Sequence, residues 1–241
     1  MSITIQWLGQ AGFLIRMSNG KTIGIDPYLG DSCMRRFGFR RMTLAPMDIS
    51  QFHVDYLFIS HQHADHLDID LYESLQRRND IQIYGNAPCV DVLKKFDLDS
   101  SRLQIMNIGD QLDFDGFSLQ VIPADHGDGC PGALGFLFDF SGTSVYFAGD
   151  TAYNPELLKD ACRTQPQIAL LPINGAYGNL NSEEAAKLAV DIGCRMVIPC
   201  HFWMFVEHGS DPLEFSRKME ELAPQVQTRF MGVGEELEIG N

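Results

Sequence analysis

Four metal-binding side chains fall within six consecutive residues of this chain, in the segment His61-Gln-His63-Ala-Asp65-His66. Imidazole and carboxylate groups are the ligands that suit zinc, manganese and iron. The apolar run 54–60 precedes the segment and is typical of a buried strand, so the cluster lies on a loop between a strand and a helix. Because four ligands spaced so closely cannot all reach one ion without straining the backbone, we interpret the spacing as a site for two divalent ions.

Three more metal-binding residues each follow an apolar stretch that is typical of a strand. His126 follows residues 119–124, Asp150 follows residues 144–149, and His201 follows residues 195–200. Any one of them alone would be an ordinary polar residue at a strand end. Together with the cluster, the three positions indicate one metal centre built from several strand ends.

The seven residues, in this order, resemble the metallo-β-lactamase superfamily, whose signature is H-x-H-x-D-H followed by a later His, Asp and His. The resemblance implies an α/β (α+β) fold, a four-layer αββα sandwich with the site along one rim. It also implies a role for each residue: one ion bound by His61, His63 and His126, a second bound by Asp65, His66 and His201, and Asp150 bridging the two.

Further motifs resemble the branch that contains the bacterial L-ascorbate-6-phosphate lactonases. They are Asp26-Pro-Tyr-Leu, Gly149-Asp150-Thr151, residues 171–175 and residues 198–201. The resemblance implies a lactonase acting on a phosphorylated sugar lactone such as L-ascorbate 6-phosphate. Two divalent ions lower the pKa of a bridging water to near 7, so a metal-bound hydroxide would attack the ring carbonyl. We expect Asp65 to orient the water and to carry its proton to the leaving alkoxide.

The segment 33–42 concentrates arginine residues between aromatic ones. Guanidinium groups match phosphate and carboxylate oxygens, so the segment could clamp a small anionic substrate beside the metals. The alternative is a solvated loop whose arginines balance nearby acidic groups. The residues that we expect to touch substrate are Arg35, Arg36, Arg40, Asn174, Tyr177, Trp203 and His208.

Composition limits the class of protein. The 241 residues are 45% hydrophobic and no linker divides them, which predicts one catalytic domain over residues 1–241. No apolar run reaches the roughly 18 residues of a membrane span, and the first residues do not resemble a secretory signal, so we expect a cytoplasmic protein with six reduced cysteines. A net charge of −14 argues against a nucleic-acid partner. Whether the chain forms a homo-oligomer stays open.

Three other functions share parts of this pattern. A metal-dependent phosphodiesterase would use the same two-metal site. A redox diiron protein of the same fold usually has Glu where His63 stands, so His63 favours hydrolysis. A non-catalytic metal-binding module would be expected to lose ligands, and this chain retains all seven. Zinc, manganese and iron all accept this ligand set, and relative affinity does not decide between them.

Hydrophobic periodicity and turn residues predict alternating elements. We expect strands at 3–8, 12–17, 21–26, 81–84, 112–124, 134–140, 143–148, 168–172 and 195–199, with helices at 68–76, 87–96, 154–162, 182–192 and 211–222.

Overall fold

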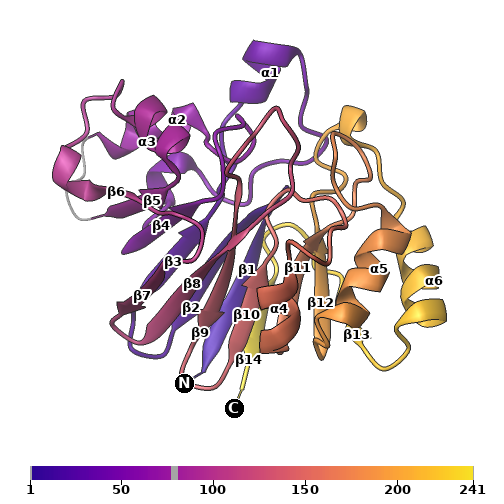
Figure 1. The fold of residues 1–241 in the computed structure, drawn as a ribbon. Helices are drawn as coiled ribbons and strands as arrows, with labels where there is room; N and C mark the ends of the chain where they lie inside the picture. The colour runs from indigo at the N-terminus through magenta and orange to yellow at the C-terminus, as the bar shows by residue number, and fades with distance from the viewer. Residues whose placement is uncertain (1, 77–80, 241) are drawn as a thin grey trace.

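Two β-sheets packed face to face organise the chain in the computed structural model, which describes residues 2–76 and 81–240 (Figure 1). Within these residues, the first seven-stranded sheet has the order β14-β1-β2-β3-β4-β5-β6 and the second has the order β13-β12-β11-β10-β9-β8-β7. The first sheet comprises β1 (Ile3–Gly9), β2 (Gly12–Met17), β3 (Thr22–Ile25), β4 (Tyr56–Ile59), β5 (Gln82–Gly85), β6 (Leu103–Ile105) and β14 (Glu236–Ile239). The second comprises β7 (Gln111–Phe114), β8 (Phe117–Pro123), β9 (Leu134–Asp139), β10 (Ser144–Phe147), β11 (Ile168–Pro172), β12 (Met196–Cys200) and β13 (Gln227–Thr228).

Each sheet has an antiparallel half and a parallel half. Strands β14, β1, β2 and β3 pair antiparallel, and β3 to β6 pair parallel. In the second sheet β7 to β10 pair antiparallel, and β10 to β13 pair parallel. Parallel strands covered on both faces are nearly continuous in apolar residues, as β11 is. Because parallel strands end at the same edge of a sheet, the loops that follow β4, β10 and β12 gather at one rim.

Helices cover the outer faces and complete the αββα sandwich that the sequence predicts. Helices α2 (Ile69–Leu75) and α3 (Ala87–Leu93) lie on the side of the first sheet, while α4 (Lys159–Thr164), α5 (Ser182–Asp191) and α6 (Pro212–Leu222) lie on the side of the second (Figure 1). Helix α1 (Ser32–Phe37) lies at the end of the molecule opposite the two termini (Figure 1). No helix in the described part of the chain is long and apolar enough to cross a membrane.

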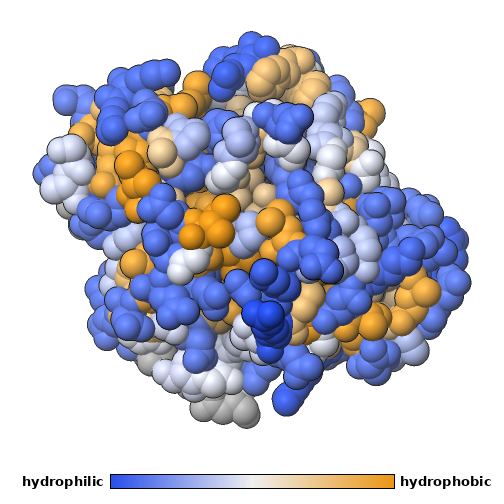
Figure 2. Space-filling model, in the orientation of Figure 1, coloured by the Kyte–Doolittle hydropathy of each residue, from blue (hydrophilic) through white to orange (hydrophobic). Residues whose placement is uncertain are grey.

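Aromatic rings join the two sheets in the core. Phe58 of β4 packs edge-on against Phe138 of β9 with ring centroids 5.5 Å apart, and Phe13 of β2 meets Phe147 of β10 at 6.3 Å. Edge-to-face aromatic pairs at such distances add to the stabilisation that burial provides. The outer surface is mostly hydrophilic with scattered apolar patches (Figure 2). The packed interior fixes the strand ends that hold the site.

Several elements differ from the sequence-based expectation. The helix expected over 154–162 begins only at Lys159. Residues 32–37, where no helix was predicted, form α1, and Gly38 with φ of 80° follows its last residue. Edge strand β14 was not predicted, because its alternating exposed residues offer little apolar signal and its pairing with β1 connects opposite ends of the chain. The six cysteines are free thiols, as expected.

Candidate metal centre

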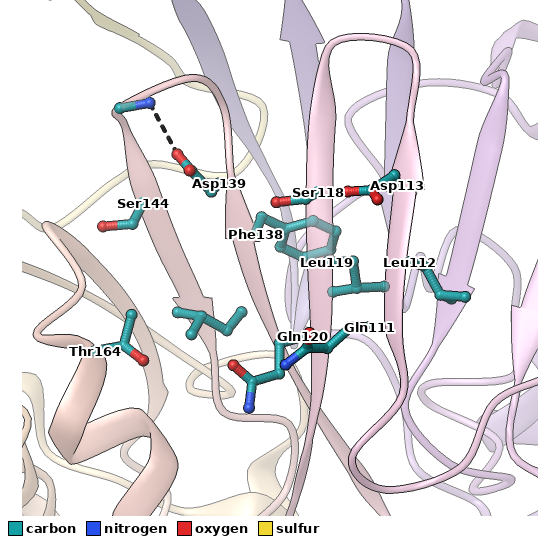
Figure 3. Close-up of a pocket in the computed structure, with 12 residues that line it drawn as sticks. Gln111, Leu112, Asp113, Ser118, Leu119, Gln120, Phe138, Asp139, Ser144 and Thr164 are labelled. Atoms are coloured by element: carbon teal, nitrogen blue, oxygen red, sulfur yellow. Dashed lines mark hydrogen bonds between the residues drawn. The ribbon is translucent and has the colours of Figure 1, made fainter.

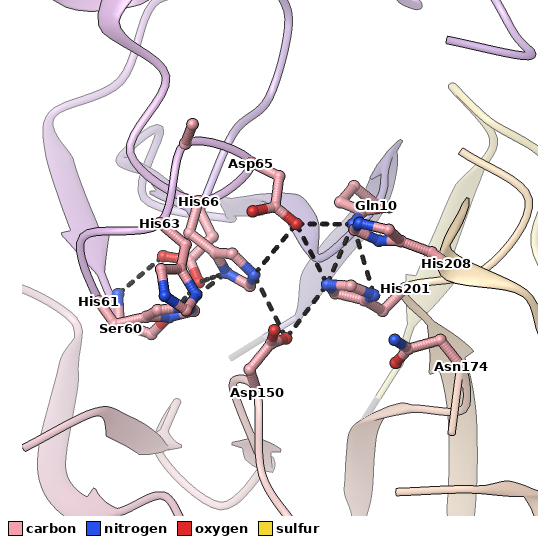
Figure 4. Close-up of polar contacts among 12 residues, drawn as sticks. Gln10, Ser60, His61, His63, Asp65, His66, Asp150, Asn174, His201 and His208 are labelled. Atoms are coloured by element: carbon pink, nitrogen blue, oxygen red, sulfur yellow. Dashed lines mark hydrogen bonds and ion pairs between the residues drawn. The ribbon is translucent and has the colours of Figure 1, made fainter. Parts of the chain in front are cut away.

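The seven predicted ligands gather at the rim where the two sheets meet. The loop between β4 and α2 supplies His61, His63, Asp65 and His66, and the segments after β8, β10 and β12 supply the other three. We call residues 61–66 the metal loop. Figure 4 shows Asp65 and Asp150 between the histidines of this loop and His201. Residues separated by up to 140 positions in the sequence, from 61 to 201, therefore form one cluster.

Three histidines form the first group, and their ring nitrogens converge. Nε2 of His61 lies 2.9 Å from Nδ1 of His63, and Nε2 of His126 lies 3.1 Å from the same Nδ1 atom. Each ring nitrogen presents either one lone pair or one N–H, so these contacts cannot all be good hydrogen bonds. A cation at their common point would satisfy the three lone pairs together.

Two histidines and a carboxylate form the second group. Nε2 of His201 lies 3.3 Å from Oδ2 of Asp65, and Nε2 of His66 lies 3.7 Å from it. The ligand atoms of Asp65, His66 and His201 all lie within 4.8 Å of one another, as do those of His61, His126 and Asp150. Both groups therefore have the donor chemistry and the convergence of a site for a divalent ion.

Asp150 lies between the two groups and faces both. Its Oδ1 atom is 3.2 Å from Nε2 of His66 and 3.3 Å from Nε2 of His201, while its Oδ2 atom is 3.6 Å from Nε2 of His126. Among the described atoms, Nε2 of His66 and Oδ1 of Asp150 are buried without a hydrogen-bond partner, although they are so close. Buried polar groups normally have a partner, and these two atoms face each other without one. A cation between them would bind both the imidazole nitrogen and the carboxylate oxygen.

The backbone brings Asp150 close to the metal loop by means of Gly149. This residue has φ of 65°, and a Cβ atom there would lie 2.7 Å from the carbonyl oxygen of Leu134 and 3.4 Å from Cβ of Ser60. Only glycine fits such a close approach in this conformation. The Gly149-Asp150 pair in the sequence is therefore explained by packing.

Asp26 holds His66 from behind. Its buried carboxylate accepts hydrogen bonds from Nδ1 of His66 at 2.7 Å and from the backbone N–H of Ser60 at 2.8 Å, and it also contacts the Ser60 hydroxyl. With its Nδ1–H directed to Asp26, His66 can present the Nε2 lone pair to the centre. In the sequence, Asp26 stands out only as part of the motif Asp26-Pro-Tyr-Leu, because only the fold brings it next to His66.

Gln10 is a second residue that the sequence did not reveal. Its Nε2 atom donates to Oδ2 of Asp65 at 2.8 Å, and it lies 3.0 Å from Nε2 of His201 and 2.9 Å from Nδ1 of His208. Gln10 is fully buried in the turn between β1 and β2, and the imidazole of His208 stacks on that of His201 with centroids 4.9 Å apart. In the sequence, Gln10 is indistinguishable from an ordinary polar turn residue.

Three residues of the centre adopt left-handed backbone conformations. The φ angles are 51° at Gln10, 41° at Asp26 and 59° at His201. Such conformations cost free energy in residues other than glycine and persist where the surroundings fix them. Their concentration at the rim shows that the fold imposes the positions of these side chains.

The two groups differ in their electrostatics. Burial acts to lower the pKa of His201, but Asp150 and Asp65 outweigh burial and raise that pKa to about 9. The pKa of His66 is likewise raised well above its usual value, since Asp150, Asp65 and Asp26 outweigh burial. By contrast, burial, reinforced by neighbouring imidazoles, lowers the pKa values of His61 and His126. In the metal-free protein at neutral pH, the histidines of the second group therefore carry an extra proton, whereas His61 and His126 of the first group are neutral.

A cavity of about 240 Å³ opens beside the centre. Cys33, Phe37, Phe39, Ala64 and Tyr177 line it together with His208 and five of the predicted ligands. A larger hollow of about 520 Å³ lies over β7, β8, β9 and β10 beside α4 (Figure 3). Its carboxylate Asp139 serves the adjacent hairpin by accepting from the N–H of Gly142 at 2.8 Å. No histidine lines this hollow within the described residues, so the smaller cavity is the candidate active site.

Only two of the seven residues that we expected to contact substrate line the cavity at the metal centre. Tyr177 and His208 line the cavity at the centre, whereas Trp203 lines a separate apolar groove and Asn174 lines a neighbouring hollow. The expected arginine clamp does not form around the cavity in the described part of the chain. Arg35 forms an ion pair with Asp70, the Arg36 guanidinium lies 5.3 Å from the ring centroid of Phe37, and Arg40 lines another surface hollow.

Comparisons with known proteins agree with this geometry. Residues 21–202 match the β-lactamase superfamily domain. A UPF0173 metal-dependent hydrolase of Methanopyrus kandleri is 28% identical over 252 residues, covering 97% of this chain and 99% of the relative.

Solved structures show the same fold. Igni18, a metallo hydrolase from Ignicoccus hospitalis, has a TM-score of 0.78 and 25% identity, with 100% of each chain covered. An isothiocyanate hydrolase from Delia radicum gut bacteria has a TM-score of 0.80 with 18% identity and 98% of each chain covered, a likeness in fold alone. With three quarters of its length inside the matched domain and this arrangement of strands, the chain belongs to the β-lactamase superfamily domain family and has the metallo-β-lactamase fold.

Proposed function

We propose that this metal-dependent hydrolase binds two divalent ions at the rim and uses them to open a cyclic ester. The observation that supports a two-ion centre most directly is the position of Asp150, whose two carboxylate oxygens face different histidine groups. A carboxylate that faces both groups at once suits a bridge between two ions better than a ligand of one. The ions would be held by His61, His63 and His126 on one side and by Asp65, His66 and His201 on the other.

When bound, two divalent ions polarise an ester carbonyl and make water a nucleophile at neutral pH. The protein must then manage one proton. We assign this role to Asp65, whose Oδ2 atom is fixed by the Gln10 amide at 2.8 Å. Asp65 would accept a proton from the attacking water as the new C–O bond forms, and would return it to the alkoxide released when the ring C–O bond breaks.

The finer expectation of a phosphorylated sugar lactone has less support than lactone opening itself. It depends on the arginine-rich segment, and those arginines lie away from the cavity lining. The lactonase branch is supported by the order of the motifs, and L-ascorbate 6-phosphate is the phosphorylated substrate to test.

The test is ring opening by metal-stripped protein reloaded separately with manganese and zinc. L-Ascorbate 6-phosphate and a neutral lactone would be compared with a generic phosphodiester. We expect metal-dependent lactone opening that is lost in Asp150→Asn and retained in Asp139→Asn, which changes an exposed carboxylate in the larger hollow. Cleavage of the diester alone would replace this proposal with a phosphodiesterase, and full turnover by Asp150→Asn would place the chemistry elsewhere.

A further inference from the structure

The cavity beside the metal centre has one chemically reactive wall and one apolar wall. The metal-centre residues form the reactive wall, and Cys33, Phe37, Phe39, Ala64 and Tyr177 form the apolar one. Burial raises the pKa of the Cys33 thiol to about 12, so this sulfhydryl is uncharged at neutral pH. The apolar wall therefore has no charged group to bind an ionic substituent.

Phe39 is the centre of this wall. Its ring lies 5.8 Å from that of Phe37, 6.4 Å from that of Tyr177 and 5.7 Å from the imidazole of His208. Phe37 and Tyr177 are 56% and 59% exposed, so both have faces free to cover a bound group. Rings at these separations present edges and faces suited to another aromatic ring.

Away from the metal centre, the cavity wall offers no cationic partner for an anionic substituent among the described residues. Among the described residues, neither lysine nor arginine lines the cavity. The arginine that comes nearest in sequence to Phe37, Arg36, lies over the ring of Phe37. The chain as a whole has a net charge of −14, which opposes the approach of anions.

The cavity also limits size. Its volume of about 240 Å³ is below the roughly 300–1,000 Å³ of pockets that hold drug-sized ligands. A long acyl chain or a nucleotide would extend beyond it. A lactone ring with one compact substituent, such as a phenyl group, suits this space.

We propose that the substrate is a small neutral lactone with an aryl substituent, which packs against Phe39 and Tyr177 while its carbonyl faces the metal centre. This inference depends on the proposed lactone opening and narrows it to a substrate class. The apolar wall would supply binding energy through burial of the aryl group, and the reaction is the ring opening described above. Phosphorylated and carboxylated lactones would be poor substrates.

The first test uses metal-loaded protein and two lactones that differ in one substituent: γ-phenyl-γ-butyrolactone and γ-carboxy-γ-butyrolactone. We expect kcat/KM for the phenyl compound to be about tenfold higher or more, from burial of the ring. Phe39→Ala should bring the ratio of the two kcat/KM values close to one, and unsubstituted γ-butyrolactone, run on both proteins, corrects that ratio for any general loss of turnover. The matched control is Ile108→Ala, which shortens an exposed apolar side chain outside the cavity.

The second test separates binding from catalysis. Calorimetry would compare 5-phenyl-2-pyrrolidinone with pyroglutamate, two lactams that differ in the same substituent, on metal-loaded wild type, Phe39→Ala and the more conservative Phe39→Leu. Tighter binding of the phenyl lactam that weakens in both variants supports the substrate class. If no lactone is opened in the first test, only the proposed function is overturned, and this binding result still supports the substrate class. Equal or tighter binding of pyroglutamate, or a phenyl preference that survives in a folded Phe39→Ala protein, would overturn the substrate class.

Discussion

The two halves of the metal centre are built differently. The half formed by His61, His63 and His126 consists of imidazoles alone; His63 is exposed, and Nδ1 of His126 is buried without a hydrogen-bond partner among the described residues. The half formed by Asp65, His66 and His201 is more deeply buried. Asp26 supports His66 from behind, and Gln10 contacts both Asp65 and His201.

The protein itself holds the ligands of the second half in place more firmly than those of the first. Asp26 and Gln10 hold the candidate ligands of the second half by hydrogen bonds. In metalloproteins, such supporting hydrogen bonds raise the affinity of a site for its ion. The first half has fewer such supports, so its imidazoles depend on the ion to hold them together. We therefore expect metal binding by the second half to weaken when Asp26 or Gln10, which hold its ligands, is replaced. Metal binding by the first half should weaken mainly when a ligand itself is lost.

Loss of a ligand from the first half should have the largest effect. His63→Ala removes one of three convergent nitrogens, and we expect it to lower kcat by about 10³-fold or more, comparable with removal of a main electrostatic group from an active site. Bound metal should fall from two ions to one per chain, as measured by elemental analysis after gel filtration. Two retained ions with full activity would show that the first half is misassigned.

The support behind His66 should have the next largest effect. Asp26→Asn keeps the shape of the side chain but weakens its hold on the Nδ1–H of His66, and we expect the affinity for the second ion to fall by about 10–100-fold. Isothermal titration with zinc measures both affinities. Asp55→Asn is the control, because Asp55 also accepts several hydrogen bonds but lies at Lys21 and Thr22. An equal loss in both halves would contradict the comparison.

The halves should also respond differently to pH. The pKa of His201 is about 9 in the metal-free protein, so an ion entering the second half displaces a proton at pH 7 and its affinity should rise about tenfold per pH unit for each proton released. Titrations in buffers of different ionisation enthalpy count the protons. The first half, with lowered pKa values at His61 and His126, should release none above pH 7.

The same pKa predicts how the metal-free protein changes in stability with pH. A folded-state pKa raised from 6.5 to about 9 means that His201 contributes stability that is fully present below pH 6.5 and is lost as the pH rises through about 9. Denaturant titrations of stripped wild type and His201→Gln should therefore converge at high pH. A difference that grows above pH 9 would contradict the assignment.

Removal of Gln10 should have the smallest effect. Gln10→Leu deletes the amide that fixes Asp65, and we expect a fall in kcat of about tenfold, at the lower end for groups that orient ligands. KM should stay nearly constant, because Gln10 does not line the cavity. A large change in KM with constant kcat would indicate that Gln10 contacts substrate instead.

The strand-end positions of the candidate ligands follow local rules, whereas the αββα sandwich was implied by the resemblance of the motifs to the metallo-β-lactamase superfamily. Buried parallel strands are apolar throughout, and residues such as His61 and Asp150 come directly after them, so their gathering at one rim could be inferred without coordinates. Asp26 and Gln10 could not be found in this way, since each acts on a partner about 40 to 200 positions away. Their positive φ angles also have no signature in the sequence.

The arginine-rich segment shows a second limit of sequence reasoning. Four arginines among aromatic residues indicate an anion site only if their side chains face the cavity. Folding of residues 32–37 into α1 instead brings Arg35 to Asp70 on α2, while Arg41 donates to the carbonyl oxygen of Tyr28 at 3.0 Å. The aromatic residues of the same segment line the cavity. Side-chain direction, which composition does not reveal, therefore places the aromatic residues of this segment and not its arginines at the cavity.

Electron paramagnetic resonance during titration of metal-free protein with manganese(II) tests whether two ions share Asp150. We predict binding of two ions per chain and a spin-coupled spectrum at saturation, with the coupling lost in Asp150→Asn and kept in Asp139→Asn. One ion per chain, or two ions whose spectra stay uncoupled in the wild type, would contradict a shared carboxylate and the mechanism built on it.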